Sequence, residues 1–200
     1  MHRLLIIALS AVTTTACSGQ TGDSQTENQH FCIPDHREVR IDLSYSSDPN
    51  FDSDDGAEQS LQAEFSAEEI AAAINGYKST VIVRDSQLYQ GIYLMLDKRP
   101  QKREVPQPQP DDLQPLASGL YTADKSTFLW RAYKPDAEGD FQYWGDCFDY
   151  IASTSGYSCH RMFYFDDWEV TFEIDHQNIP VSDQVDDFIR QQLTSWRCKK

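Results

Sequence analysis

The order of hydrophobic and polar residues predicts a chain rich in β-structure. The segment 39–45 (VRIDLSY) alternates strictly, which is typical of a half-buried strand. Further strands are expected at residues 80–84, 88–96, 127–133, 141–152, 158–165 and 168–175. Short polar turns separate several of these segments. Strands joined in this way pair antiparallel, so we expect an antiparallel sheet.

The last two of these strands predict a specific register, because only residues 166–167 separate them. A hairpin centred there makes one face almost wholly apolar, the pattern of a sheet that is packed on one side. The expected cross-strand pairs are Phe165–Trp168, Phe163–Val170, Arg161–Phe172 and Cys159–Ile174.

Two helices are expected. Ser66 and Glu69 form a capping box in which each side chain bonds the amide of the other, and Asn75-Gly76 ends the helix that follows. Ser182 is expected to cap a C-terminal helix on the apolar sheet face. Its apolar stripe is Val185, Phe188, Ile189, Leu193 and Trp196. The sequence therefore predicts one α+β domain at residues 31–200, with about six to eight antiparallel strands, this helix on one face and one further short helix.

Residues 98–115 form a proline-rich loop between two predicted strands. The segment holds five of the nine prolines and four basic residues, which is typical of an extended, polyproline-like chain. A loop of this length between strands is uncommon unless it has a function. Its role is not predicted by the sequence.

The N-terminus has the layout of a bacterial secretory signal. Arg3 is followed by an apolar stretch at residues 4–12 and by small residues up to Ala16. The stretch is far shorter than the roughly 20 residues that span a bilayer. The segment resembles a lipobox, which implies cleavage after residue 16 and lipidation of Cys17. The alternative is an ordinary signal cleaved near Ala16.

The residues after Cys17 favour a flexible tether that ends in an outer-membrane anchor. Residues 18–29 are rich in small and polar side chains and have no branched aliphatic residue, so residues 17–30 are expected to be the lipidated cysteine and its tether. In similar lipoproteins a serine in the place of Ser18 goes with transport to the outer membrane. We expect an anchor there that faces the periplasm, with several acyl chains holding it.

Four cysteines remain beyond the signal: Cys32, Cys147, Cys159 and Cys198. An even number in an oxidising compartment predicts two disulfides, with three possible pairings. A hairpin centred on Ser153 sets Cys147 opposite Cys159, so that pairing is favoured. Cys32 and Cys198 would then join the two ends of the folded part.

The charge of the chain argues against nucleic acid as a partner. The chain has 32 acidic and 17 basic residues, a net charge of −15. A basic protein is the natural partner for such a field, which speeds encounter. The candidate contact is an acidic stretch, with Phe51 as a buried anchor and four steering carboxylates: Asp52, Asp54, Asp55 and Glu58.

Candidate catalytic and metal motifs are weak. No GxSxG motif exposes a serine, and Ser158 and His160 would share a strand face beside a disulfide. The loop DPNFDSDDG spaces oxygen donors like an EF-hand but has Ser53 and Gln59 where glycine and glutamate are needed. Asp146 and Asp149 near Trp144 and Tyr150 suggest a sugar site only faintly. We expect no catalytic residue, no metal and no cofactor.

Four short motifs carry a resemblance to a known group of proteins. They are Cys32-Ile33-Pro34, Gly156-Tyr157-Ser158-Cys159-His160-Arg161, Asn178-Ile179-Pro180 and Trp196-Arg197-Cys198. With the lipidated start, the chain resembles small Gram-negative lipoproteins that include immunity proteins against the phospholipase effectors of type VI secretion. The resemblance implies a lipid-anchored periplasmic protein that neutralises such a toxin by binding it. The alternatives are an envelope accessory or assembly lipoprotein that acts by protein contact, and a hydrolase that acts on cell-wall sugars.

Overall fold

The computed structural model describes residues 31–38, 59–83, 86–99, 101–105, 107–109, 112–116, 118–123, 128–150 and 156–198. Several sequence predictions lie outside these residues: the signal at 1–16, Cys17 and the tether at 17–30, the strand at 39–45, and the acidic contact formed by Phe51, Asp52, Asp54, Asp55 and Glu58.

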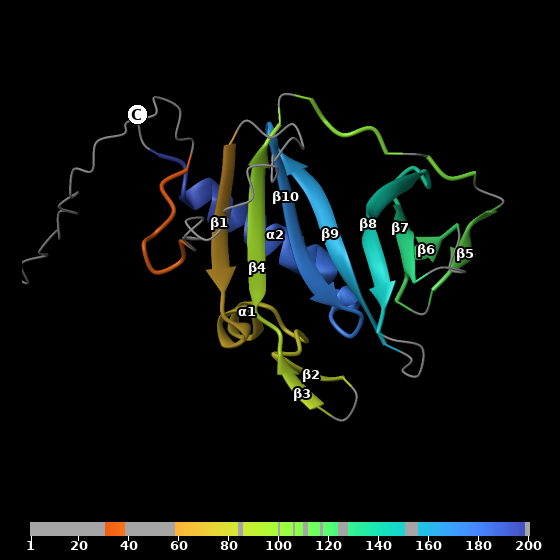
Figure 1. Ribbon diagram of the computed structural model, residues 1–200, viewed down its shortest axis with the longest axis horizontal. Helices are drawn as coiled ribbons and strands as arrows, with labels where there is room; N and C mark the ends of the chain where they lie inside the picture. Colours follow the sequence, from red (N-terminus) through yellow and green to blue (C-terminus); the bar gives the residue numbers. More distant parts are fainter. Residues whose placement is uncertain are drawn as a thin grey trace, which may run out of the picture.

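An antiparallel sheet of eight strands dominates the fold, as the sequence predicts (Figure 1). Its strands in spatial order are β1 (Gln59–Phe65), β4 (Ile92–Lys98), β10 (Trp168–Asp175), β9 (Tyr157–Phe165), β8 (Phe141–Asp149), β7 (Leu129–Pro135), β6 (Tyr121–Thr122) and β5 (Gln114–Pro115). All four predicted cross-strand pairs between β9 and β10 are confirmed. Two consecutive strands with a two-residue turn leave little freedom of register.

The C-terminal helix α2 (Ser182–Ser195) crosses behind the sheet (Figure 1). Its predicted stripe packs on the sheet, since Val185, Ile189 and Leu193 are fully buried. The predicted cap is wrong, however. Ser182 is the first helical residue after the 3-10 turn η3 (Ile179–Val181), and no side chain caps the helix.

The short helix α1 (Ala67–Ala73) begins as predicted, because the Ser66 hydroxyl accepts a hydrogen bond from the Glu69 amide. The reciprocal half of the capping box is wrong. The Glu69 carboxylate instead accepts a bond of 2.6 Å from Arg37. A charged partner is preferred because a charge-assisted hydrogen bond is stronger than one between neutral groups.

The strand predicted at residues 88–96 is in fact two strands. Strands β2 (Thr80–Val83) and β3 (Ser86–Tyr89) form a separate two-stranded sheet, here called the arm, and β4 belongs to the main sheet. The chain turns from one to the other at Gly91. A Cβ atom there would lie 2.9 Å from the carbonyl oxygen of Phe65, so glycine allows the close approach.

Both favoured disulfides are present, Cys147–Cys159 and Cys32–Cys198. The first joins directly paired positions of β8 and β9. The second joins cysteines with a sequence separation of 166, and beside it Phe31 bridges to Arg197. Within the described part of the chain, no helix has the length and apolar character needed to cross a membrane.

Candidate functional site

The face of the sheet opposite α2 carries an open hollow of about 600 Å³. Side chains alternate across a sheet, so the positions between the buried residues of each strand point to this open face. Five strands and the proline-rich loop line the hollow with Tyr93, Met95, Asp97, Arg103, Glu104, Val105, Arg131, Tyr143, Asp146, His160, Met162, Glu169, Thr171, Phe172 and Glu173.

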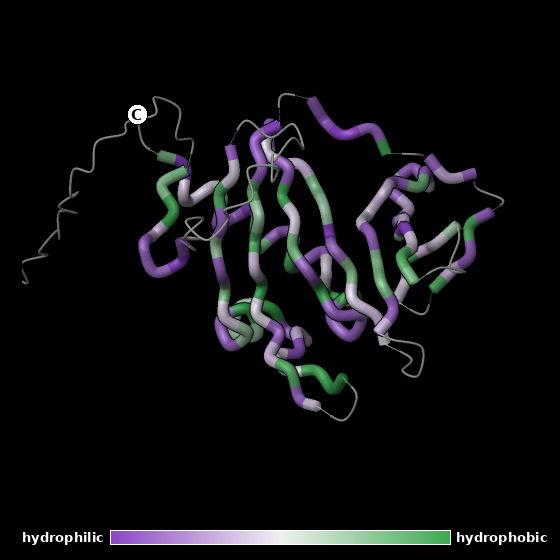
Figure 2. Tube along the Cα trace, viewed as in Figure 1, coloured by the Kyte–Doolittle hydropathy of each residue, from purple (hydrophilic) through white to green (hydrophobic). Residues whose placement is uncertain are grey.

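One wall of the hollow is the described first part of the proline-rich loop, residues 99 and 101–105, here called the strap. The strap leaves the end of β4 and is hydrophilic in Figure 2 except at its far end. Buried Glu169 holds it, because one carboxylate oxygen lies 3.2 Å from Arg99 Nε and 3.0 Å from Arg103 Nε. The Tyr164 hydroxyl donates to the same oxygen and accepts from the Arg103 amide. The loop is therefore fixed to the sheet at this end.

Three charged side chains and a histidine form a row, here called the charged row, across four strands of the open face. In register order the row is Arg131, Asp146, His160 and Glu173. Glu173 accepts a hydrogen bond of 2.6 Å from the Ser158 hydroxyl. Among the described residues, neither Asp146 nor Glu173 forms an ion pair, in contrast to Glu169.

A β-bulge in β8 brings Tyr143 and Asp146 to the same face. The register shifts at Ala132/Tyr133, opposite Gly145. A Cβ atom on Gly145 would lie 2.2 Å from the carbonyl oxygen of His160, so only glycine fits there. Burial first, and then the negative charge of Asp146, raises the pKa of Tyr143, which stays neutral in the hollow.

Apolar groups lie beside the charged row. Tyr93 and Met95, two positions apart on the same face of β4, are 39% and 41% exposed. Met162 of β9 lines the same hollow. The arm exposes further apolar groups, Ile82 and Tyr89, and its strand β2 is mostly hydrophobic in Figure 2. Tyrosine and methionine are enriched in protein interfaces, whose rims are polar.

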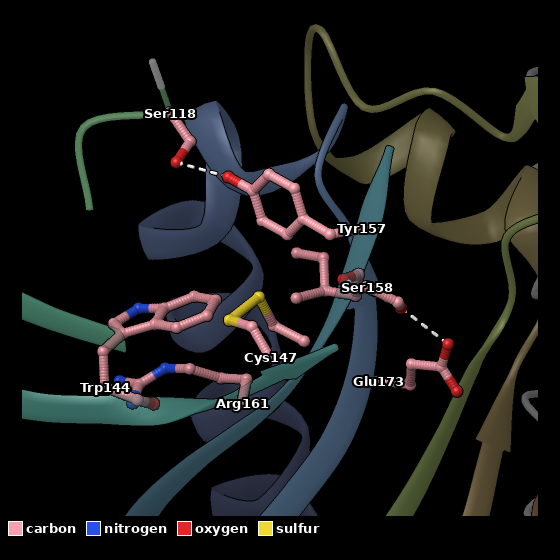
Figure 3. The surroundings of a disulfide bond; sticks show 9 residues. Ser118, Trp144, Cys147, Tyr157, Ser158, Arg161 and Glu173 are labelled. Carbon is pink, nitrogen blue, oxygen red and sulfur yellow. Dashed lines mark hydrogen bonds between the residues drawn. A yellow bond between two sulfur atoms is a disulfide. The ribbon is translucent and has the colours of Figure 1, made fainter. Parts of the chain in front are cut away.

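The sequence candidates for catalysis do not come together. Ser158 and His160 share the open face, but the hydroxyl of Ser158 donates to Glu173 and points away from the disulfide (Figure 3). The ring of His160 packs against Phe148 with centroids 5.3 Å apart. The described residues include no group of three or more metal-ligating side chains that could hold an ion.

The carboxylates suggested for sugar chemistry are also separated. Asp146 and Asp149 are three residues apart in one strand and so point to opposite faces. Trp144 is buried on the α2 side, where Arg161 lies over its ring at 5.1 Å (Figure 3). Tyr150 donates to buried Asp175. Neither aromatic ring offers a free platform for a sugar.

The hollow itself was not predicted from the sequence. Its residues come from segments up to 80 positions apart, from Tyr93 to Glu173. The signal in the sequence is the alternation in β10, where Glu169, Thr171 and Glu173 mark an open face without showing what lies on it. Compared with protein-family models, with curated proteins and with solved structures, the chain matches none.

Proposed function

We propose that this protein is a lipid-anchored immunity protein at the periplasmic face of the outer membrane. It binds a toxic enzyme of type VI secretion, a phospholipase, one to one and blocks it. The observation that carries the proposal is the open face, where exposed Tyr93 and Met95 border a hollow in which Asp146 and Glu173 form no ion pair with a described residue. Such a face supports the binding of a protein partner.

The scaffold behind the open face supports the same role. Two disulfides and the buried stripe of α2 hold the sheet, so the open face presents a fixed arrangement of side chains. A fixed surface loses less conformational entropy on binding, which favours tight complexes. The resemblance to lipoproteins that include immunity proteins agrees with this role. The acidic stretch with Phe51 remains a predicted steering element.

The test is neutralisation of a phospholipase effector encoded beside this gene. The effector is produced in the periplasm of a bacterium with and without the full chain, and survival is scored. In vitro, phospholipase activity is titrated with the purified chain. We expect inhibition to end at one equivalent. Undiminished activity in the presence of excess chain contradicts the proposal.

A pair of variants places the contact. Tyr93→Ala with Met95→Ala removes the apolar groups of the open face, and we expect both survival and inhibition to be lost. The matched control is Asp187→Ala with Gln191→Ala on the exposed side of α2, which should protect like the wild type. Equal melting temperatures establish that both variants fold. Full protection by the open-face variant would show that the toxin binds elsewhere.

The alternative function is an accessory or assembly lipoprotein of the envelope that acts through the proline-rich loop. The anchored strap favours it, because residues 101–104 are exposed yet held in place by Arg99 and Arg103. Replacing residues 101 and 102 by glycine separates the two proposals. Loss of envelope integrity with toxin protection intact supports the alternative.

A further inference from the structure

We infer that the hollow on the open face binds an arginine-bearing segment of a protein partner, with Asp146 and Glu173 as the guanidinium acceptors. This inference rests on the proposed function and names the chemistry of its contact. It places that contact on the sheet and not in the acidic stretch at residues 51–58.

The first argument is the balance of charge inside the hollow. Five carboxylates line it, those of Asp97, Glu104, Asp146, Glu169 and Glu173. Glu169 is paired with Arg99 and Arg103, and Asp97 accepts from Ser60 and lies 3.7 Å from Arg99. Three arginines, Arg99, Arg103 and Arg131, stand against these five carboxylates, so the hollow keeps a net negative charge, which Asp146, Glu173 and Glu104 supply.

The second argument is the spacing of the row. Asp146 and Glu173 pair with His160 from its two sides, so they are two strand spacings apart, or about 10 Å. Each carboxylate can accept its own guanidinium. Asp146 is half-buried and Glu173 is exposed, and a carboxylate without a cation gains more from a partner's charge than one that is already paired.

The third argument is the chemistry of the walls. Tyr93 and Tyr143 present aromatic rings and Met95 and Met162 present thioethers beside the carboxylates. A guanidinium stacks on aromatic rings, and the aliphatic stem of arginine covers apolar surface. A metal ion would contact only the carboxylates of this lining, and a purely apolar peptide would contact only its aromatic rings and thioethers.

The kind of partner follows from the charge of the whole chain. With a net charge of −15, the protein attracts a basic protein and repels acidic ones. The carboxylates of the hollow then form the specific contact with the attracted protein. The strap limits the hollow at one side, so an arginine-bearing segment approaches from the side that the strap leaves open.

The experiment uses a short arginine–serine repeat peptide as probe, with the same peptide carrying neutral citrulline in place of arginine as its control. The chain has three methionines, and two of them, Met95 and Met162, line the hollow. Methyl-labelled methionine in the purified full chain therefore reports directly on the site. Titration at low salt follows both the methyl shifts and the Kd.

We expect the arginine peptide to shift both methyl signals and the citrulline peptide to leave them in place. Asp146→Asn with Glu173→Gln should raise the Kd at least about tenfold. Asp187→Asn with Glu138→Gln removes the same charge outside the hollow and should change the Kd less than about twofold. Equal weakening in both pairs, binding of the citrulline peptide, or unmoved methyl signals overturns the inference.

The experiments distinguish failure of this inference from failure of the proposed function. If the peptide fails to bind in the hollow while one equivalent of the chain still inhibits the phospholipase, the inference fails and the function stands. If the peptide binds through Asp146 and Glu173 but no effector is inhibited, the hollow is an arginine site and the immunity role fails.

Discussion

One carboxylate oxygen of Glu169, a residue that is 3% exposed, lies 3.0 Å from the Nε atom of Arg103 and so fastens the strap to strand β10. Arg99 meets the same oxygen from the base of the strap. Removing only the carboxylate from a buried carboxylate–arginine cluster strongly destabilises the protein, because the arginine charges stay buried without a partner.

Glu169→Gln should therefore lower the free energy of unfolding by about 3 kcal/mol. Urea unfolding measures this loss. Trypsin provides a local readout, since the freed strap should be cut faster after Lys102 and Arg103. The comparison variant is Arg103→Gln, whose side chain is half exposed, and it should lose about 1 kcal/mol or less. Equal losses in the two variants would show that Glu169 is not the centre of the network.

A second buried ion pair fixes α2 to the sheet. Arg161 donates to Asp186 at 2.6 Å and to the carbonyl oxygen of Trp144 at 2.6 Å. Burial raises the pKa of Asp186, against the lowering effect of Arg161. We expect Arg161→Met and Asp186→Leu each to cost about 3 kcal/mol, and the double variant to cost much less than their sum. Additive losses in a double-mutant cycle would exclude coupling between the two.

The two disulfides should differ in their contribution to stability. The loops that they close differ greatly, with sequence separations of 166 and 12. In the chain-entropy model, Cys32→Ser with Cys198→Ser costs about 5 kcal/mol, and Cys147→Ser with Cys159→Ser about 3 kcal/mol. Urea unfolding of the two variants in parallel checks the order. The reverse order would mean that native packing around Cys147 outweighs loop length.

Stability should fall in alkali partly through Tyr143. Its pKa is raised in the folded state, so its contribution is complete below about pH 10, the usual tyrosine value, and is lost as the pH rises from there through the folded pKa. Tyr143→Phe should lose less stability than the wild type between pH 9 and pH 11, as measured by urea midpoints. Tyr89→Phe serves as the reference for loss of an exposed hydroxyl. If the urea midpoint of the Tyr143→Phe variant falls with pH as steeply as that of the wild type, this hydroxyl does not have this role.

The elements predicted correctly are those whose signals are local. The register of β9 and β10 follows from a two-residue turn, and the stripe of α2 from its helical period. Strand β1 was missed, although Leu61, Ala63 and Phe65 alternate, because the residues just before it are acidic. Strands β5 and β6 have two residues each, too few for any period to show.

The candidate site depends on placements that no local pattern contains. The pairing of Arg131 with Asp146 and of Asp146 with His160 requires the order of three strands and a bulge at Gly145. The role of Glu169 could not be foreseen, because its partners lie in a loop some 70 residues earlier. Only the compact fold makes them neighbours.

The bond between Cys32 and Cys198 also has a mechanical consequence. A force applied to the chain ahead of residue 32 reaches the C-terminal end of the domain through a covalent link and bypasses the loop between them. Tension between the two ends of the chain is therefore carried by this disulfide and not by the hydrogen bonds between the strands.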